Sequence, residues 1–272
     1  MRSEQSELAT YRLYPHNDWE TLSPSSASKI HSRKRIRLPS SLCKPSLRAY
    51  FDWDDSGNED YAKRPVLLDL FAGGGGAAMG YYLAGFRVVG VDIEPQPHYP
   101  FKFYQADALE FPLEGYDAYH ASPPCLGYSA TANLPWLKDK EYPLLIFSTR
   151  LMLQSIGKPY IIENVKRARL GCKQLETRKI AEHGMDAGVL CGCMFGLPFF
   201  FERLFETNFL WWQPRHQKHN GLTQGRMFGG RLRLAQDAKY KLVDWMDKEE
   251  ASEAIPPAYT EYIGKYLLKA IK

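Results

Sequence analysis

Apolar runs alternate with helical patterns through the middle of the chain. The run at 66–71 is continuous and apolar, as in strands buried in a parallel sheet, and further parallel strands are predicted at 87–92, 116–121 and 160–162, with a weaker one at 101–105. One helical pattern spans 77–84 and is closed by Gly85. A second opens at Pro143 and ends at Gly157, and its apolar positions predict one buried face: Leu144, Ile146, Phe147, Leu151 and Leu153. This alternation predicts an α/β fold with a Rossmann-like sheet.

The first strand runs directly into a glycine-rich loop. Ala72 to Gly76 is followed by a helix, and this strand, loop and helix form the first unit of a nucleotide-binding fold. Bare backbone in such a loop lets a ligand approach closely. Asp92 ends the next strand about 20 residues later, where a carboxylate binds ribose hydroxyls in folds of this kind. The alternative is that Asp92 caps the turn before the proline-rich loop 95–100.

Polar residues end the predicted strands in succession. They are Asp69, Asp92, Asp107, Cys125 and Glu163. Because the carboxyl ends of parallel strands lie on one edge of an open sheet, we expect these side chains to line a ligand site there.

Cys125 lies in the stretch Tyr116 to Ser129, directly after Pro123 and Pro124. Two prolines fix the backbone and remove two donors, so the cysteine is held on a stiff turn outside any strand ladder, as a nucleophile would be. The alternative is a small buried apolar residue, which is what most cysteines are. The loop 126–140 that follows is long and lacks clean periodicity, which is typical of a lid.

Composition and cysteine content narrow the class of protein and its cellular compartment. The 272 residues are 44% hydrophobic, enough for one sizeable domain and a smaller one. Five irregularly spaced cysteines, with neither a signal peptide nor a long apolar span, predict a reduced, cytoplasmic protein that does not enter a membrane. The spacing of Cys191-Gly-Cys193 differs from that of a zinc knuckle, although His183 is near, so no metal site is predicted.

The chain divides into four predicted segments. They are an N-terminal extension at 1–64, a catalytic domain at 65–206, a small recognition region at 207–243, and a segment at 244–272 that returns to the catalytic domain. The net charge of +4 is concentrated locally. Between Lys29 and Arg48 seven basic residues occur without an acidic one, and this tract is either a phosphate-binding arm or a solvated tail.

An ordered set of motifs resembles the DNA (cytosine-5) methyltransferase family, in its compact phage and bacterial form. The motifs are Asp69-Leu-Phe-Ala-Gly-Gly-Gly-Gly, the strand ending in Asp92, Ala106-Asp-Ala, Ser122-Pro-Pro-Cys-Leu-Gly-Tyr-Ser, Ile162-Glu-Asn-Val and Ala254-Ile-Pro-Pro-Ala-Tyr-Thr-Glu-Tyr-Ile-Gly. Each motif is common alone, but the order over residues 66–206 and 244–267 is specific. The resemblance implies an S-adenosylmethionine-dependent methyltransferase.

The resemblance also implies roles for single residues. Cys125 would attack C6 of a cytosine turned out of the duplex, Glu163 would stabilise the charge at N3, and Arg203 would help hold the base. We expect a locally positive environment that lowers the pKa of the thiol. Residues expected to bind S-adenosylmethionine are Phe71, Gly73, Gly75, Asp92, Ile93, Asp107, Ala108 and Pro123. Phe71 could instead pack in the core.

The expected partner is double-stranded DNA, bound by a monomer in the cytoplasm of a bacterium or a phage-infected cell. Basic residues of 202–241, interleaved with Trp211, Trp212, His219 and Phe228, suit phosphate contact and base insertion, or else form a solvated basic face. The region is short, so we expect a recognition site of about two to four base pairs.

Three residues depart from the family's pattern. Leu126 replaces a glutamine, Phe201 replaces the first arginine of an Arg-x-Arg element, and Glu253 replaces an asparagine. Glu253 near the methionine end would disfavour a donor with an extra acidic group, so we expect plain methyl transfer. Two alternatives remain open: an RNA-directed cytosine-5 methyltransferase, and a catalytically weak regulator that binds DNA and the cofactor.

Overall fold

The computed structural model describes residues 59–128, 142–166, 168, 186–197, 199–216, 219, 223–224 and 243–272. The basic tract 29–48, the predicted lid beyond Tyr128 and most of the predicted recognition region lie outside these residues. Within the described part of the chain, none of the helices has the length and hydropathy needed to cross a membrane.

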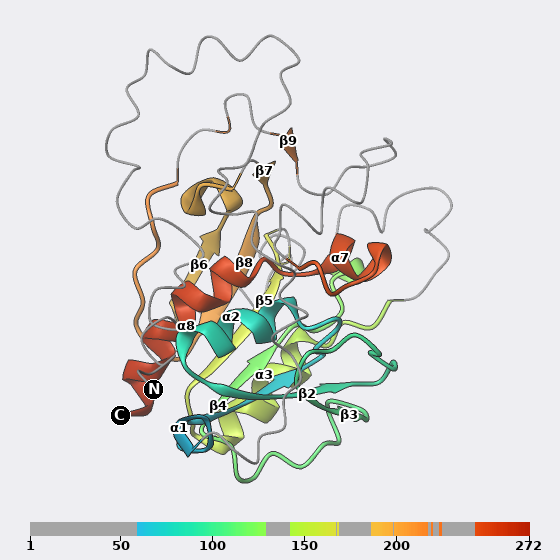
Figure 1. The fold of residues 1–272 in the computed structure, drawn as a ribbon, viewed down its shortest axis with the longest axis vertical. Helices are drawn as coiled ribbons and strands as arrows, with labels where there is room; N and C mark the ends of the chain where they lie inside the picture. Colours follow the sequence, from blue (N-terminus) through green and yellow to red (C-terminus); the bar gives the residue numbers. More distant parts are fainter. Residues whose placement is uncertain are drawn as a thin grey trace, which may run out of the picture.

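A seven-stranded sheet forms the centre of the molecule (Figure 1). Its strands, in spatial order, are β3 (Lys102–Gln105), β2 (Arg87–Asp92), β1 (Val66–Leu70), β4 (Ala118–Ala121), β5 (Tyr160–Val165), β8 (Arg203–Thr207) and β6 (Asp186–Leu190). The strands β3, β2, β1, β4 and β5 pair in parallel, while β8 is antiparallel to both β5 and β6. The predicted α/β fold with a Rossmann-like sheet is therefore confirmed.

Helices cover both faces of the sheet (Figure 1). One core joins strand residues such as Leu67 and Val88 to α2 (Gly76–Ala84) and α8 (Pro257–Ile271). The other joins Leu68 and Val89 to α3 (Ile146–Ile156). Neighbouring strand residues point to opposite faces, so continuous apolar runs are what a sheet covered on both sides requires.

Smaller elements complete the described structure. They are the helices α1 (Glu59–Ala62) and α7 (Lys248–Glu253), the 3-10 helices η8 (Leu126–Tyr128) and η10 (Gly192–Phe195), and the strands β7 (Phe199–Phe200) and β9 (Thr223–Gln224). α1 lies inside the predicted extension, and its Tyr61 is buried. Arg64 lies over the rings of Tyr61 and Tyr82, at 5.4 and 5.1 Å, so this end of the extension packs against α2.

The predicted buried face of the second helix is wrong in three of its five positions. α3 begins at Ile146 rather than at Pro143, and Leu144, Phe147 and Leu151 are 59%, 48% and 50% exposed. The side that faces the sheet instead carries Arg150, whose Nε and Nη2 donate to the carboxylate of Glu206 on β8 at 2.5 and 2.8 Å. A buried guanidinium needs such a partner, so the ion pair explains how Arg150 can occupy the inward side of α3.

Close packing of α2 on α8 depends on Gly80. A Cβ atom at this position would lie 2.0 Å from Thr260 Oγ1 and 2.2 Å from the carbonyl oxygen of Pro257. Gly80→Ala should therefore separate the helices and lower the free energy of unfolding by about 3 kcal/mol, despite the better helix propensity of alanine. Thermal unfolding followed by circular dichroism tests this. Ser155→Ala, on the exposed side of α3, is the control, and equal melting temperatures for the two variants would contradict the prediction.

Candidate active site

The glycine loop between β1 and α2 has the backbone conformation of a ligand cradle. Phe71, Gly73 and Gly75 all have positive φ, at 57°, 50° and 86°. A Cβ atom on Gly75 would lie 2.6 Å from Pro100, whereas one on Gly73 would meet no atom within 4 Å. Gly75 is therefore required by packing, while the space beside Gly73 is open to a ligand.

Asp92 ties this loop to the end of β2. Its Oδ2 accepts a hydrogen bond from the Gly73 amide at 2.9 Å, and its Oδ1 accepts one from the Glu94 amide at 3.0 Å. The carboxylate is thus a turn cap, as one of the two sequence interpretations has it. An ionised carboxylate accepts about four hydrogen bonds, so it retains capacity for ribose hydroxyls.

The other predicted cofactor residues lie at the same edge of the sheet. Ile93 is 63% exposed, and Asp107 is exposed with its Oδ1 accepting from the Leu109 amide at 2.8 Å. Ala108 and Pro123 are buried, with Ala108 in the core behind the edge. An exposed apolar side chain beside carboxylate acceptors suits an adenine and its ribose, so these residues fit S-adenosylmethionine.

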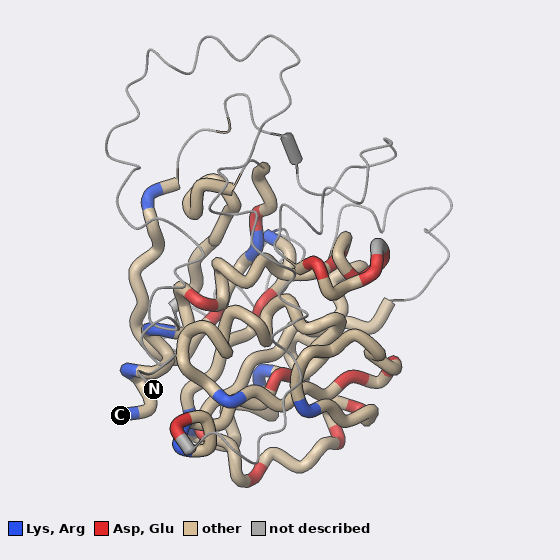
Figure 2. Tube along the Cα trace, viewed as in Figure 1, with Lys and Arg blue, Asp and Glu red and all other residues tan. Residues whose placement is uncertain are grey.

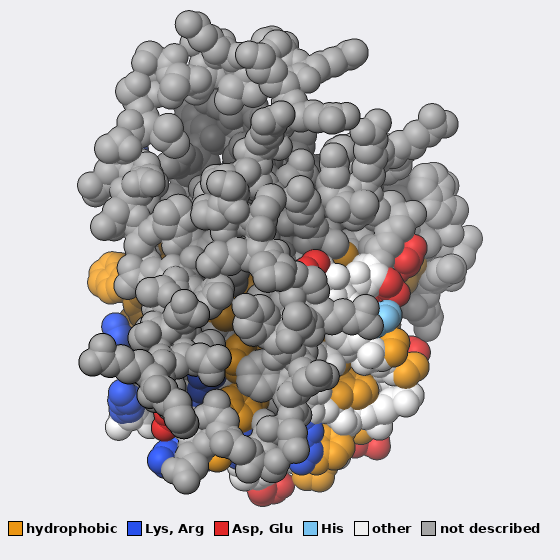
Figure 3. Space-filling model, viewed as in Figure 1, with side chains coloured by type: hydrophobic (Ala, Val, Ile, Leu, Met, Phe, Trp, Pro, Cys, Tyr) orange, Lys and Arg blue, Asp and Glu red, His pale blue; other side chains and the backbone are white. Residues whose placement is uncertain are grey.

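The C-terminal segment closes over the glycine loop. The indole nitrogen of Trp245 donates to the Gly74 carbonyl at 3.0 Å, and His98 contacts Glu250 of α7 at 3.0 Å. Acidic residues lie along α7, including Glu249 and Glu250 in its first turn (Figure 2), and acidic side chains are exposed on this face of the molecule (Figure 3). Glu253, at the end of this helix, is exposed, and the next residue, Ala254, packs against Gly76. The segment therefore brings negative charge near the loop.

Cys125 lies on a turn held at two points. The amide of Ser122 donates to the Leu70 carbonyl at 3.1 Å, and the side-chain amide of Asn164 donates to the Pro123 carbonyl at 2.9 Å. The amide of Tyr128 then donates to the Cys125 carbonyl at 3.1 Å. Cys125 is partly exposed, so it meets the access that a nucleophile needs.

Glu163 lies inside β5 rather than after it, and it is 4% exposed. Burial raises the pKa of its carboxyl group, whereas the Arg203 guanidinium and a hydrogen bond with Ser122 oppose that rise. Arg203 Nε is 3.6 Å from Glu163 Oε1, which is too long for a good hydrogen bond. Both atoms lack a hydrogen-bond partner among the described residues. Because this buried acceptor and this buried donor lie close together without hydrogen-bond partners, they are suited to binding a polar ligand.

A buried polar chain leads away from this carboxyl group. Ser122 Oγ contacts His120 Nε2 at 2.8 Å, and His120 Nδ1 contacts the Tyr81 hydroxyl at 2.8 Å. Burial lowers the pKa of His120 to about 3, so the imidazole is neutral near pH 7. Ser122 therefore links Glu163 to a fixed, uncharged partner. The local signal in the sequence was a histidine and a serine next to the Pro-Pro-Cys turn, in an otherwise apolar strand.

Asp69 does not reach the ligand edge, contrary to the expectation from the strand ends. It lies within β1 and is 1% exposed. Its Oδ2 accepts from the Tyr99 hydroxyl at 3.2 Å, and its Oδ1 is 4.0 Å from His120 Nε2. Burial raises the pKa of this carboxyl group well above its usual range. The strand continues one residue further than Asp69, and that places its side chain in the interior.

Phe201, which replaces an arginine of the family's pattern, supports the arginine that remains. The Arg203 guanidinium lies over the Phe201 ring, 4.3 Å from its centroid. The Phe201 carbonyl accepts from the Tyr259 hydroxyl of α8 at 2.8 Å. Arg203 is therefore fixed by a cation–π contact and by its charge interaction with Glu163.

The aromatic residues expected at the DNA surface separate into different environments. Trp211 is 9% exposed and packs so closely on Gly188 that a Cβ there would lie 2.6 Å from its ring. It is a core residue, so the expectation that it contacts DNA is wrong. Trp212 is 80% exposed, and His219 stacks on Phe200. Phe228 lies outside the described residues.

Comparisons with known proteins find similarity to methyltransferases. No family model matches the sequence. Over 232 residues the chain is 25% identical to the Type II methyltransferase M.AquIA of Picosynechococcus sp., covering 71% of this chain and 89% of that protein. Among solved structures, the Dnmt2 methyltransferase of S. pombe matches with a TM-score of 0.40, 18% identity and 56% of this chain. EhMeth of Entamoeba histolytica matches with a TM-score of 0.41, 16% identity and 64% of this chain. This chain covers 52% and 62% of those two structures.

Proposed function

We propose that this chain, which is 25% identical to a Type II methyltransferase, transfers a methyl group from S-adenosylmethionine to C5 of cytosine in double-stranded DNA. The observation that carries the proposal is the junction between β4 and β5. There the Ser122 hydroxyl bonds to Glu163, and the Asn164 side chain bonds to Pro123 two residues before Cys125. A thiol and a buried carboxyl group are thereby held at one edge of the sheet, next to the glycine loop.

The chemistry needs both groups. C5 of cytosine is a weak nucleophile until another group adds to C6, so the Cys125 thiolate forms a covalent bond there. Addition places negative charge on the ring, and a protonated Glu163 stabilises it by donating to N3. After C5 has taken the methyl group, loss of its proton returns the electron pair to the ring and expels the thiolate. Burial, which favours the protonated carboxyl, supports this role.

S-adenosylmethionine would supply the methyl group from its sulfonium. In our proposal Asp92 holds the ribose, Phe71 and Ile93 contact the adenosine, and Asp107 accepts from the adenine amino group. Gly73 leaves room for the methionine end, while Gly75 lets the loop pack against Pro100. The acidic residues around α7, with Glu253 at its end, favour a cationic donor and disfavour one with an added carboxylate, which supports plain methyl transfer.

The substrate cytosine must leave the base stack to reach Cys125, at a cost of a few kcal/mol. Arg203 lies at the carboxyl group that would contact the ring, where it can hold the base. Because α7 carries Glu249 and Glu250 in its first turn, DNA phosphates are repelled from that side, and we place the duplex over the Cys125 edge.

The test is methyl transfer by the purified full chain. Labelled S-adenosylmethionine is incubated separately with duplex DNA and with transfer RNA, and bisulfite sequencing then locates the modified bases in the DNA. We expect label in DNA at cytosines within a short common sequence. Label confined to transfer RNA would support the RNA-directed alternative, and no transfer to either would support a regulator. Mass spectrometry showing a C5 substituent heavier than methyl would contradict plain methyl transfer.

Ser122 is expected to position Glu163 rather than to contact the substrate. Ser122→Ala removes the hydrogen bond that opposes the rise in the pKa of Glu163. We therefore expect kcat to fall by about tenfold, because the carboxyl loses its alignment, and the alkaline limb of the pH profile to move to higher pH. Ser122→Thr keeps the hydroxyl and should restore both. A fall in kcat without a shift of the alkaline limb would contradict this role.

A further inference from the structure

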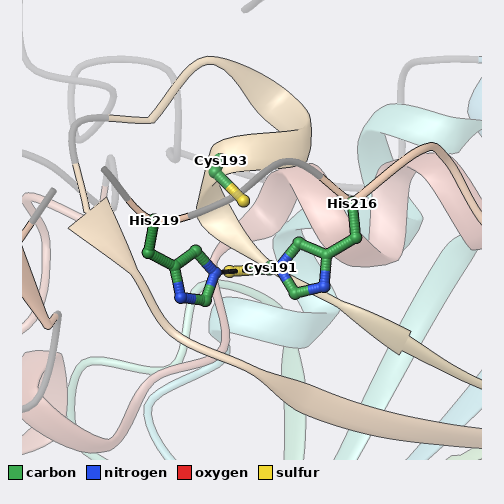
Figure 4. Close-up of side chains that lie close together, drawn as sticks. All are labelled: Cys191, Cys193, His216 and His219. Atoms are coloured by element: carbon green, nitrogen blue, oxygen red, sulfur yellow. Dashed lines mark hydrogen bonds between the residues drawn. The ribbon is translucent and has the colours of Figure 1, made fainter. Parts of the chain in front are cut away.

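Two cysteines and two histidines converge at the end of β6, away from the predicted nucleophile. Cys191 directly follows β6, and Cys193 lies in η10. His216 and His219 come from the chain beyond β8. Figure 4 shows the four side chains pointing toward one another. One ligand atom from each lies within 4.8 Å of the other three.

The separations resemble those of a tetrahedral metal site. Cys191 Sγ is 3.4 Å from His219 Nε2, and His219 Nε2 is 2.8 Å from His216 Nε2. With zinc bonds of about 2.3 Å to sulfur and about 2.0 Å to nitrogen, neighbouring ligand atoms would be about 3.3–3.8 Å apart. Small rotations of the imidazoles would therefore admit an ion at the centre.

We propose that Cys191, Cys193, His216 and His219 bind one zinc ion that joins the end of β6 to the chain leaving β8. Two thiolates and two imidazoles form a donor set that selects zinc over magnesium or calcium, which prefer oxygen ligands. Four protein ligands leave no position for water, so the ion is structural rather than catalytic.

The surroundings of the cluster orient its ligands. The His219 ring stacks on Phe200, with centroids 4.4 Å apart and planes 6° apart. His216 Nδ1 is 3.9 Å from Glu202 Oε1, so its other nitrogen faces the cluster while this one faces a carboxylate. Zinc-binding histidines commonly direct the second nitrogen at a carboxylate or carbonyl, and this fixes the tautomer.

The short Cys-x-Cys spacing, which predicts no zinc knuckle, is explained by the local fold. A Cβ atom on Gly192 would lie 2.4 Å from the Phe199 carbonyl oxygen, so only glycine lets the chain turn tightly there. The turn enters η10 directly and returns the second sulfur toward the first. The histidines, 23 to 28 residues beyond the two cysteines, complete a set that no local motif contains.

The position of the site suggests what the ion stabilises. Glu202 lies next to Arg203, and Lys166 contacts Glu202 at 2.6 Å. In the sequence, the two cysteines thus precede β7, and the two histidines follow β8, the strand that carries Arg203. Without the ion, we expect the end of β6 and the following histidine segment to separate, because neutral imidazoles and thiols attract one another weakly.

Metal content of the purified full chain tests the site without any measurement of methyl transfer. Plasma mass spectrometry should find one zinc ion per chain. Cys193→Ala and His216→Ala should lose most of the zinc, while Cys193→His, which keeps a ligand, should retain it. Cys125→Ser removes a thiol outside the cluster, and His98→Ala removes a histidine near Asp247 and Glu250. Both controls should bind as much zinc as the wild type.

Two measurements on the wild type keep the proposal testable if the variants do not fold. Replacement of zinc by cobalt should give the visible absorption bands of tetrahedral cobalt with thiolate ligands. Addition of a chelator should lower the melting temperature by about 10 °C. Wild-type protein purified from zinc-supplemented medium with far less than one zinc per chain would overturn the proposal, as would Cys193→Ala retaining the wild-type zinc content.

Discussion

Cys125→Ser should abolish covalent capture of DNA. A duplex containing 5-fluorocytosine cannot lose a proton from C5, so the bond between Cys125 and C6 should persist and give an adduct that survives denaturing electrophoresis. Serine is a far weaker nucleophile at neutral pH, and loss of a nucleophile commonly lowers kcat by about four orders of magnitude or more. We expect no adduct and no measurable methylation from this variant.

The loss should be specific to chemistry. Cys125 is partly exposed, and the hydrogen bond at this position uses its carbonyl, which the substitution keeps. Melting temperature and S-adenosylmethionine affinity should therefore match those of the wild type. Cys43→Ser, at a thiol outside the family motifs, is the matched control and should still form the adduct. An adduct of normal yield with Cys125→Ser would refute the assignment of the nucleophile.

Glu163→Gln should lower kcat by about 100- to 1,000-fold while leaving DNA binding nearly unchanged. The amide can still donate a hydrogen bond, but it cannot deliver a proton to N3. In the wild type, rising pH ionises Glu163 and removes the proton needed at N3, so the rate should fall through the pKa of this carboxyl group. The raised pKa of Glu163 places the falling limb above the usual range of a carboxyl group. That limb should be absent from the variant.

The same shift affects stability. The folded carboxyl binds its proton more tightly than the unfolded chain does, so Glu163 stabilises the fold at low pH, and this contribution is lost as pH rises through the raised pKa. As pH rises through this range, the free energy of unfolding of Glu163→Gln should therefore fall less than that of the wild type. Glu261→Gln, an exchange on the outer side of α8, should change neither profile. A falling limb that persists in Glu163→Gln would assign it to another group.

Much of the fold was determined by local sequence. Continuous apolar runs identify β1 and β2 to within a residue, because strands buried on both faces cannot alternate with polar positions. Gly85 and Gly157 end their helices as predicted, since both have the positive φ that glycine adopts without strain. The ordered motifs predicted a DNA methyltransferase, and the chain is 25% identical to a Type II methyltransferase over 71% of its length. The roles of Cys125, Glu163 and the cofactor residues remain predictions.

Tertiary structure decided which polar groups face one another. The Arg150–Glu206 pair lies on the buried side of α3, which its apolar positions do not predict, and Trp211 packs against Gly188 in the core. The contact of Ser122 with Glu163 depends on β4 lying beside β5. The cluster of Cys191 and His219 likewise joins residues 28 positions apart. Hydrophobic periodicity predicts only which positions of a helix or strand face the core. The partner of a buried polar group is set by the order of strands in the sheet.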